Sequence, residues 1–253
     1  ETSRQPLSPR QRDFLQDVAA RTFRFFERTV GEGTNYLPPD NLQVDPPKGA
    51  APRTSPTNIG MYLLSCVCAH ELSLLSADDA AIRIERTVGT MERMEKWRGH
   101  LLNWYDIRML EPLPCRYVST VDSGNLCACL LLCAQALRAW LAELDVAHRD
   151  LPERLDALGA AMDFRSLYDE SVDLFYIGMD LENLSPGEAH YDLLASEARL
   201  TSFLAIMRRE VPARHWSRLN RAMTKARAGA ALLSWSGTLF EYLLPALFLQ
   251  SPR

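Results

Sequence analysis

Apolar residues recur at spacings of three and four along most of the chain, which is the period of α-helices that bury one side. Alternation of apolar and polar residues, which predicts strands, is almost absent, and residues 173–177 fit either a strand or a loop. Pro9, Pro56 and Pro212 favour helix starts because proline suits the first helical position. The pattern predicts an all-α fold with helices at residues 9–30, 56–75, 78–97, 123–144, 151–162, 191–209, 212–223 and 236–249.

Polar and aromatic residues are concentrated in alternate connections between these helices. The connections at 75–78 and 145–150 are plain surface turns by comparison. We call the connections that are rich in polar and aromatic residues loaded. Helical hairpins whose loaded connections all lie at one end predict an (α/α) barrel of the six-hairpin toroid type. Such a ring needs about twelve helices of about 12 residues each plus loops, so we expect it to be incomplete here. The loaded connections are residues 37–41, 53–58, 99–106, 117–125 and 234–237.

Composition narrows the classes of partner. The 253 residues include 28 Lys and Arg against 32 Asp and Glu, and no basic block alternates with aromatic residues, so nucleic acid is not expected as a partner. No apolar run approaches the roughly 20 residues that span a bilayer, and no direct membrane contact is expected. The chain begins without Met and stops abruptly. We expect residues 1–253 to be a single domain from a larger multidomain protein.

Most of the six cysteines fall inside apolar helical runs, as in residues 126–132. This is typical of free, buried thiols in a reducing compartment. A zinc site would need Cys-x-x-Cys pairs or histidines at ligand spacing, and neither Cys66-x-Cys68 nor Cys127-x-Cys129 provides them. Phosphate-binding glycine loops, His-Glu-x-x-His and Gly-x-Ser-x-Gly patterns are also absent. No metal or cofactor is expected.

Residues 185–200 carry the densest set of chemical groups in the chain. Apolar residues after Tyr191 predict a helix there, and Glu197 falls close to its apolar face. A carboxylate in that position needs a cation, hydrogen-bond donors or a proton, because burying a lone charge is costly. His190 and Arg199 are the nearest candidate partners.

Two other loops offer groups of the kind that bind sugars, which stack on aromatic rings and hydrogen-bond to planar polar groups. Asn103, Trp104, Tyr105 and Asp106 form one such set, although Trp104 and Tyr105 could equally pack a loop while Asp106 caps a turn. Asp122 precedes Ser123 and Gly124, so a helix cap is as good an interpretation as a catalytic role, and the two are compatible.

The remaining candidates each have a structural alternative. Glu241 lies in a strongly apolar helix beside Tyr242 and is either a buried structural carboxylate or part of the site. Arg53 and Asn58 flank the helix start at Pro56 and either fix the loop or contact substrate. His215 and Trp216, in the helix that begins at Pro212, are interpreted as packing residues. Several carboxylates and aromatics at loop ends suit acid/base chemistry on a glycan, which needs two carboxyl groups across one bond.

Six motifs follow one another from end to end of the chain: RTSPTNIG at 53–60, NWYD at 103–106, VDSGNL at 121–126, YDLLASEAR at 191–199, WSG at 235–237 and FEY at 240–242. Together they resemble the central glucoamylase-like domain of cyclic β-1,2-glucan synthases, which is related to endo-β-1,2-glucanases. The resemblance implies an (α/α)6 barrel that cleaves linear β-1,2-glucan and closes it into a ring by retaining transglycosylation. The cysteines near Cys66 and Cys127 depart from the family's pattern but affect only packing.

The resemblance also implies a setting and a set of roles. The domain would lie at the cytoplasmic face of a bacterial inner membrane, beside the other domains of a large synthase, and its barrel would continue past this chain. Glu197 would be the essential acid/base carboxylate, with its partner outside the chain, while Asp106, Asp122 and Asp192 bind sugar hydroxyls or tune Glu197. A non-catalytic glucan-binding domain and a simple β-1,2-glucan hydrolase are the alternatives. The substrate-binding candidates are Arg53, Asn58, Asn103, Trp104, Tyr105, His190, Tyr191, Asp192, Arg199, Trp235, Glu241 and Tyr242.

The family plan makes a geometric prediction. The loaded loops should bring a set of polar and aromatic residues around one concave opening, with the turns at 75–78 and 145–150 at the other end. The ring should be open, exposing apolar surface, where further helices belong. The residues expected to converge are Asn103, Trp104, Tyr105, Asp122, His190, Asp192, Glu197 and Trp235.

Overall fold

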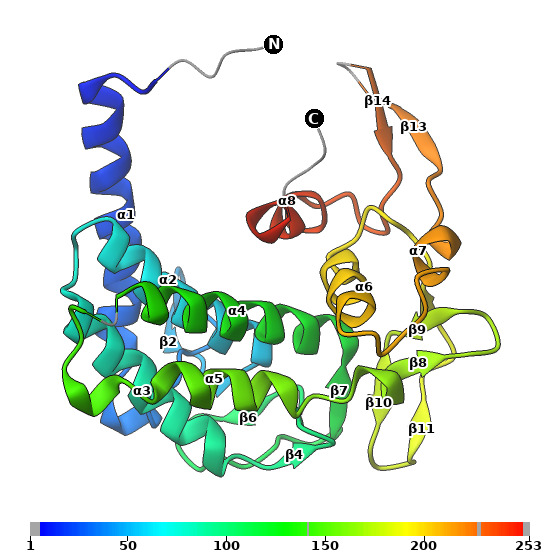
Figure 1. Ribbon diagram of the computed structural model, residues 1–253, viewed down its shortest axis with the longest axis horizontal. Helices are drawn as coiled ribbons and strands as arrows, with labels where there is room; N and C mark the ends of the chain where they lie inside the picture. The colour runs from blue at the N-terminus through cyan, green and yellow to red at the C-terminus, as the bar shows by residue number, and fades with distance from the viewer. Residues whose placement is uncertain (1–5, 141, 227–228, 250–253) are drawn as a thin grey trace.

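The computed structural model describes residues 6–140, 142–226 and 229–249 (Figure 1). Helices dominate this part of the chain, as the apolar spacing predicts. Most begin within a few residues of the expected positions. The described helices are α1 (Pro9–Thr29), α2 (Pro56–Glu71), α3 (Ala77–Arg93), α4 (Thr120–Ala139), α5 (Leu151–Ala160), α6 (Ala198–Met207), α7 (His215–Arg218) and α8 (Leu239–Phe248), with 3₁₀ turns at Glu32–Thr34, Val146–His148 and Phe164–Leu167.

Serine caps explain where the first helices begin. Ser8, Ser55 and Ser76 each accept a hydrogen bond from a backbone N–H in the first turn of α1, α2 and α3. In α4 the capping residue is Ser119, whose hydroxyl accepts from the backbone N–H of Asp122. Interpreting Asp122 as the helix cap was therefore wrong, because its carboxylate lies inside the first turn.

The helices α2 and α4 run in the same direction and are joined at both ends. At their starts, the backbone N–H of Thr57 donates to Oδ1 of Asp122 at 3.4 Å. At their far ends, the indole Nε1 of Trp140 donates to Oε1 of Glu71 at 3.1 Å. Parallel neighbours of this kind are what an inner ring of a helical toroid requires, since each is reached through an intervening outer helix.

The helix α6 follows α4 in the same direction on its other side. Thr201 Oγ1 in α6 donates to the carbonyl of Thr120 at 3.2 Å, and Arg208, one residue past α6, lies 3.5 Å from Sγ of Cys127 further along α4. Gly124 allows this approach: a Cβ there would lie 1.9 Å from Thr201 Oγ1 and 2.9 Å from its Cα. The starts of α2, α4 and α6 therefore share one end of the molecule.

The connections divide between the two ends as the sequence predicts. Residues 30–55, 94–119 and 161–197 lead into the starts of α2, α4 and α6. The two plain turns lie at the opposite end, where the backbone N–H of Asp145 donates to Oδ1 of Asp78 at 2.8 Å. Prediction and structure agree on the hairpin plan, with α3 and α5 as the returning outer helices.

Short strands organise the loaded connections, which the sequence pattern did not predict. They are two to four residues long and pair only antiparallel within the described residues. The strand alternative at residues 173–177 is confirmed by β9. The strands are β1 (Leu42–Val44), β2 (Pro47–Ala50), β3 (Arg53–Thr54), β4 (Lys96–Trp97), β5 (His100–Leu101), β6 (Tyr105–Asp106), β7 (Tyr117–Ser119), β8 (Tyr168–Asp169), β9 (Leu174–Tyr176), β10 (Gly178–Asp180), β11 (Ser185–Pro186), β12 (His190–Tyr191), β13 (Met223–Ala226) and β14 (Gly229–Leu232).

Two expected helices are shorter than predicted, and each borders one of these strands. The helix expected from Tyr191 begins only at Ala198, because Tyr191 pairs with Phe175 between β12 and β9. The helix expected at 212–223 shrinks to α7, and Met223 opens the β13–β14 hairpin. Alternation over two or three residues is too short a signal to detect in sequence, so the strands were missed.

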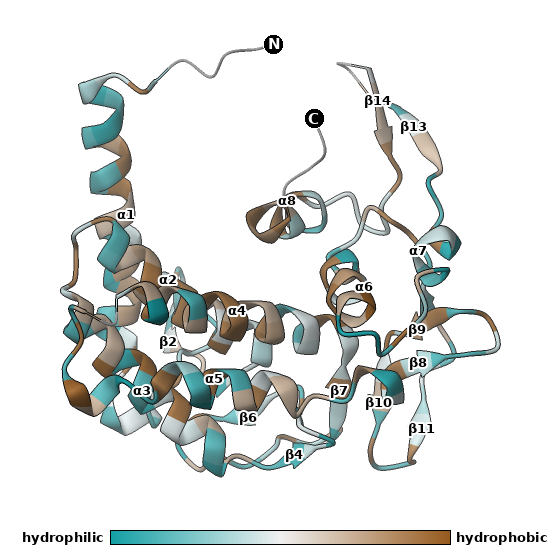
Figure 2. Ribbon diagram, viewed as in Figure 1, coloured by the Kyte–Doolittle hydropathy of each residue, from teal (hydrophilic) through white to brown (hydrophobic). Residues whose placement is uncertain are grey.

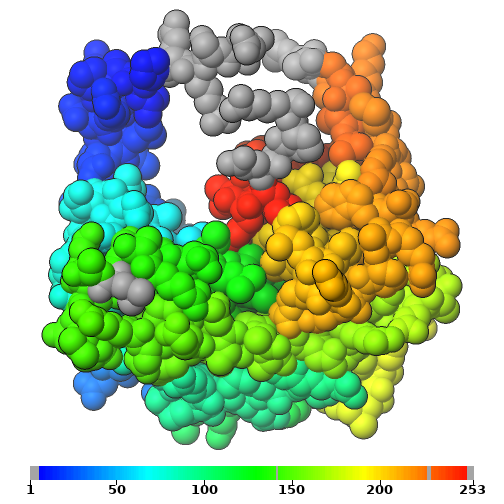
Figure 3. Space-filling view, viewed as in Figure 1, coloured from blue at the N-terminus to red at the C-terminus, as the bar shows by residue number. Residues whose placement is uncertain are grey.

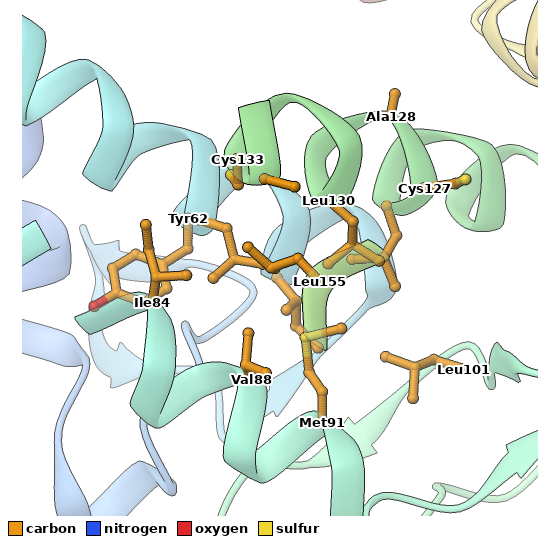
Figure 4. Packing of buried hydrophobic residues seen from close by; sticks show 14 of the residues in the cluster. Tyr62, Ile84, Val88, Met91, Leu101, Cys127, Ala128, Leu130, Cys133 and Leu155 are labelled. Atoms are coloured by element: carbon orange, nitrogen blue, oxygen red, sulfur yellow. The ribbon is translucent and has the colours of Figure 1, made fainter. Parts of the chain in front are cut away.

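The helix α4 is the centre of the core, between α2, α5 and α6 (Figure 1). Figure 4 shows side chains such as Tyr62, Ile84, Leu130 and Leu155 interlocking beside it, all at most 1% exposed. By length and mean hydropathy α4 is the one described helix that could cross a membrane, so the exclusion based on apolar runs was too strict. Yet 72% of that apolar window is buried inside the fold, as expected for a core helix.

The cysteines divide into two groups. Cys66, Cys127, Cys129 and Cys133 are free and buried, as predicted, and burial raises the pKa of the Cys66 thiol to about 12. Cys68 and Cys115 are exposed, and Cys68 lines a hollow between α1 and α2.

Several large apolar residues of α1 and α8 are exposed. Helix α1 stands away from the body at one side, with Phe14 61% exposed, and the β13–β14 hairpin rises at the other (Figure 3). Helix α8 lies between them and turns a hydrophobic side outward (Figure 2), exposing Leu239, Leu243 and Leu247. These are surfaces of the kind expected at the edges of an open ring, and the openness itself stays a prediction.

Candidate active site

Glu197 lies immediately before α6, at the end of the connection that β12 begins. Its side chain is half-buried, and burial is the main reason that its pKa is raised to about 7. The negative charge of Asp122 raises this pKa further, the charge of Glu241 adds to the effect, and a hydrogen bond from Asn125 opposes it. The sequence suggested that Glu197 lies close to the apolar face of a helix, and this was wrong. Glu197 instead lies at the start of α6, near the first turn of α4.

Asp122 is held in the first turn of α4 by contacts with α2. Its Oδ1 accepts from the backbone N–H of Thr57, which is itself in the first turn of α2. Helix starts favour negative charge because their free N–H groups carry partial positive charge. Asp122 thus lies at the starts of both α2 and α4, while burial of Glu197 and the negative charge of Asp122 favour the protonated form of Glu197.

Aromatic residues flank this pair of carboxyl groups. Tyr191 is largely buried near Glu197 and Asp122, and burial raises the pKa of its phenol well above the usual value. Its ring centroid lies 6.0 Å from that of Trp235. Trp235 is 50% exposed, and its Nε1 donates to Oδ1 of Asp192 at 3.2 Å. Together, Tyr191, Asp192 and Trp235 form a wall with an open aromatic face next to a carboxylate.

A second polar group lies on the α2 side of Asp122. Asp40 accepts from Nε and Nη2 of Arg53 at 3.2 and 3.0 Å and from Nδ2 of Asn58 at 3.3 Å. The guanidinium carbon of Arg53 is 4.8 Å from the ring centroid of Trp104. The guanidinium is thereby fixed between a carboxylate and an aromatic face. Asn58 follows Thr57 directly, so this group continues from the Asp122 contact.

Two of the predicted site residues make contacts that hold their own loop. Tyr105 is fully buried, and its hydroxyl accepts from the N–H of Leu102 and donates to the carbonyl of Glu95. Asp106 accepts from the backbone N–H groups of Arg108 and Met109 at 2.7 and 2.9 Å, which is the turn-capping alternative. The motif at 103–106 therefore mainly builds its loop, and direct contact by Tyr105 was a wrong prediction.

His190 also departs from the predicted cluster. Neighbours in a strand point to opposite faces, so Tyr191 approaches Glu197 while His190 turns away. Its Nε2 lies 2.9 Å from Oδ2 of Asp169, and its ring packs on Tyr176 at 4.7 Å. His190 is thus a support for β12 and is not the partner of Glu197 that the sequence suggested.

Arg199, the other suggested partner, is half-buried, and burial lowers its pKa. Its Nε has no hydrogen-bond partner among residues 6–140, 142–226 and 229–249. The same holds for Oδ1 of Asn103, whose backbone N–H donates to the carbonyl of Tyr117 at 2.6 Å. Both side chains therefore keep unused hydrogen-bonding capacity.

Glu241 is 7% exposed and serves its own segment. It accepts from the backbone N–H groups of Ser236 and Thr238 and from the hydroxyl of Ser234, and this bonding holds its pKa below the usual range despite burial. These contacts fit the interpretation of Glu241 as a buried structural carboxylate. Tyr242 likewise donates its hydroxyl hydrogen to the carbonyl of Leu232.

The predicted convergence is therefore partial. Asp122, Glu197, Asp192 and Trp235 are linked through Tyr191, and Trp104 lies in the neighbouring Arg53 group. Sequence reasoning missed Asp40, Thr57 and Asn125. The only available signal was their place in loaded loops or helix starts, because the contacts join residues 13 to 68 positions apart.

Other features of the molecule lie away from these carboxyl groups. One hollow of about 210 Å³ is lined by α1 and α2, including Phe26 and Cys68, and another of about 590 Å³ is lined by residues around Arg165 and Arg214. Within the described part of the chain, His, Cys, Asp and Glu form no group of three or more that could hold a metal ion.

Comparison with known protein sequences shows what this chain is similar to. No protein-family model matches the chain. Over 93% of its length, in an alignment of 358 residues, the chain is 31% identical to the cyclic β-(1,2)-glucan synthase NdvB of Rhizobium meliloti (strain 1021). The predicted resemblance to cyclic β-1,2-glucan synthases is confirmed. The chain spans only 13% of that synthase, and the alignment exceeds the 253 residues of the chain, so the synthase has additional residues within the matched region.

Solved structures show the fold. A glucoamylase-type protein from Bacteroides fragilis superposes with a TM-score of 0.70 at 18% identity over 95% of this chain and 60% of its own. The endo-β-1,2-glucanase of Chitinophaga pinensis, solved with sophorotriose and glucose, gives 0.70 at 17% identity over 92% and 57%. The endo-β-1,2-glucanase of Talaromyces funiculosus, solved with sophorose, gives 0.71 at 14% identity over 87% and 54%. The fold is that of the glucoamylase-like (α/α)6 barrels, and this chain covers 54 to 60% of the length of these three proteins.

Proposed function

We propose that this chain is the β-1,2-glucan-active part of a cyclic β-1,2-glucan synthase, with Glu197 as its acid/base carboxyl group. The observation that carries the proposal is the position of the half-buried Glu197 near Asp122, where the starts of α2, α4 and α6 meet, with its pKa raised to about 7. A group that titrates near neutral pH can both give and take a proton there. The NdvB similarity and the two endo-β-1,2-glucanases of the same fold support this choice of glycan.

The chemistry follows from what each group can supply. Protonated Glu197 gives its proton to the glycosidic oxygen as the bond to the anomeric carbon breaks and the opposing carboxylate bonds to that carbon, so the leaving sugar departs as a neutral alcohol. In the return step, ionised Glu197 takes the proton from an incoming hydroxyl, whose oxygen bonds to the anomeric carbon and releases the opposing carboxylate. If that hydroxyl belongs to the same glucan chain, the product is a ring. If it belongs to water, the product is a shortened chain.

Asp122 then has the role of tuning Glu197. Its negative charge disfavours ionisation of Glu197 and so keeps the acid protonated close to neutral pH. The opposing carboxylate that retaining chemistry needs is proposed to come from outside this chain. Arg53, Trp104, Tyr191, Asp192 and Trp235 are proposed to bind the sugars.

The setting of the domain is likewise a proposal. Because the chain spans 13% of NdvB, we infer that it acts beside the other domains of a larger bacterial synthase, at the cytoplasmic face of the inner membrane. Its ring-closing activity would depend on the parts of the barrel that this chain does not include.

The test is cleavage of linear β-1,2-glucan by the full-length protein, with cyclic and shortened products separated by mass spectrometry. Glu197→Gln keeps shape and hydrogen bonding but removes the acid, so turnover should fall by about 10² or more. Glu188→Gln, an exposed carboxylate in the same connection, is the matched control and should keep full activity. Normal turnover in folded Glu197→Gln would refute the assignment.

A second candidate is a domain that binds or guides the glucan without chemistry. The open aromatic face of Trp235 beside Asp192 favours it, since those residues need no catalytic partner. It predicts binding of linear β-1,2-glucan with no products, unchanged by Glu197→Gln and weakened by Trp235→Ala.

A further inference from the structure

His215, the first residue of α7, is fully buried, and both of its ring nitrogens have hydrogen-bond partners. Its Nδ1 lies 2.8 Å from the carbonyl oxygen of Asp173, and its Nε2 lies 2.8 Å from Oγ of Ser202. A carbonyl can only accept, so Nδ1 carries the hydrogen, and Nε2 of the neutral ring accepts from the Ser202 hydroxyl. Burial lowers the pKa of His215, which favours this neutral form. The ring therefore does more than pack, which is the role that the sequence suggested.

The two bonds join α6 to the small sheet of β12, β9 and β8 (Figure 1). Ser202 lies in α6, and Asp173 directly precedes β9. The His215 ring also packs edge-on against Phe175 of β9, with ring centroids 5.1 Å apart and planes at 88°. Phe175 pairs in turn with Tyr191 of β12. His215 is thus a direct connection between α6 and the strands that carry Tyr191.

The Asp173 end of this connection is held by further side chains. Nε of Arg214 donates to both carboxylate oxygens of Asp173 at 2.9 Å, and the Tyr168 hydroxyl donates to Oδ1 at 3.2 Å. Nε of Arg218 lies 3.7 Å from Oδ2. Asp173 has a φ of +59°, which is uncommon for residues other than glycine and persists where the surroundings fix it. The carbonyl that His215 bonds is therefore presented by a rigid turn.

The chain that follows α7 reaches the wall of the candidate site. The backbone N–H of Asn220 donates to the carbonyl of Asp192 at 2.6 Å, and the Asn220 carbonyl accepts from the N–H of Leu194 at 3.0 Å. The Asp192 carboxylate in turn accepts from Nε1 of Trp235 at 3.2 Å. One short segment is thus fastened at both ends, by His215 to α6 and by Asn220 to the wall.

We propose that His215 is a positioning residue for substrate binding, which fixes the wall of Tyr191, Asp192 and Trp235 relative to α6. This inference rests on the sugar-binding role proposed for that wall. Because α6 begins one residue after Glu197, a wall fixed to α6 is also fixed relative to the acid/base carboxyl group. Hydrogen bonds are directional, whereas apolar burial is not, so a bonded histidine sets this distance better than an apolar side chain would.

The test is the kinetics of cleavage of linear β-1,2-glucan by the full-length protein. His215→Phe keeps a ring against Phe175 and removes both hydrogen bonds, while Ser202→Ala removes one of them. The wall binds substrate and transition state alike, so His215→Phe should raise KM by about 3–10-fold with a much smaller change in kcat. Ser202→Ala should raise KM less. His215→Asn, whose amide N–H can replace Nδ1–H toward Asp173, should recover part of the loss.

A double-mutant cycle separates positioning from a general loss of stability. If His215 acts through the wall, His215→Phe should add little to the KM increase caused by Trp235→Ala, whereas independent effects would multiply. Thr87→Val is the matched control, because Thr87 is fully buried in α3 and its hydroxyl donates to the carbonyl of Tyr36 at 2.8 Å. It should lower stability and leave KM unchanged. A normal KM in His215→Phe, or full multiplication in the double variant, would overturn the proposal.

Deuterium exchange tests the hold on the wall without any substrate. The amide of Leu194, which donates to Asn220, should exchange faster in His215→Phe and in Ser202→Ala and at the wild-type rate in Thr87→Val. An unchanged rate in both of the first two variants would also overturn the proposal. Absence of turnover in the wild type would instead refute the proposed function, and the exchange rates would still decide whether His215 holds the wall.

Discussion

Gly124→Ala is the sharpest test of the idea that close packing of α4 and α6 places Glu197. An added Cβ would lie 1.9 Å from Oγ1, 2.7 Å from Cβ and 2.9 Å from Cα of Thr201. Rotation of the Thr201 side chain can move Oγ1, but the contact with Cα can be relieved only if α6 itself moves away. Ordinary contacts need about 3.5 Å or more. The start of α6, with Glu197, must therefore shift by a substantial part of an ångström.

The expected effects follow from opposing contributions. Overpacking costs about 1–3 kcal/mol in free energy of unfolding, while alanine in place of glycine inside a helix returns up to about 1 kcal/mol. We expect a net destabilisation of about 1–2 kcal/mol. Activity should suffer more, because a misplacement of about 1 Å at the reacting groups can cost about 10²-fold in rate.

The assay combines urea unfolding with turnover of linear β-1,2-glucan. Gly89→Ala is the matched control, since its Cβ would meet only Nη2 of Arg154 at 3.9 Å inside α3, and it should be neutral or stabilising. The double change Gly124→Ala and Thr201→Ala removes the nearest atom and should recover part of the lost activity. A Gly124→Ala protein as stable and as active as the wild type would refute the reasoning.

Three further changes test separate parts of the site. The raised pKa of Glu197 means that the folded protein keeps a proton that the unfolded chain loses, so its contribution to stability falls as pH rises from about 4.5 to about 7. The free energy of unfolding of Glu197→Gln minus that of the wild type should therefore be about 1–2 kcal/mol higher at pH 8 than at pH 4. This range is reduced because Glu197 is partly exposed, and urea unfolding at both pH values measures it. Glu241 has a lowered pKa, so Glu241→Gln should cost stability at pH 7, with the difference shrinking in acid and little change in kcat; a large loss of kcat at full stability would contradict this. Trp235→Ala should raise KM by about 3–10-fold if sugars stack there, whereas exposed Phe240→Ala in α8 should not.

The fold was predictable because its signals are local and long. The longest apolar patterns continue for about six helical turns, and they can be recognised without knowledge of contacts. The same is true of the helix starts at Pro9 and Pro56 and of the contrast between loaded and plain loops. The division of the loops between two ends then followed from helical hairpins alone. The missed features are short: β12 consists only of His190 and Tyr191, and a strand of two residues cannot be distinguished in sequence from the start of the helix that follows it.

The site was less predictable because it depends on which side a residue faces. Asp122 and Glu197 were identified, but their proximity depends on Gly124, whose role is visible only when Thr201 is placed against it. Tyr105 and Trp104 are adjacent in sequence, yet one is buried and the other lies beside Arg53. Nothing in the residue types distinguishes them, since either aromatic ring can pack or stack.

The two hydrogen bonds that join α2 and α4, one at each end, have a consequence for motion. Thr57 with Asp122 and Glu71 with Trp140 prevent the two helices from sliding past each other, and α5 and α6 cover the remaining sides of α4. Backbone amides in the middle of α4 should therefore exchange with deuterated water only through global unfolding. The first turns of α1, exposed on nearly all sides, should exchange within the native state and label the molecule at its outer edge first.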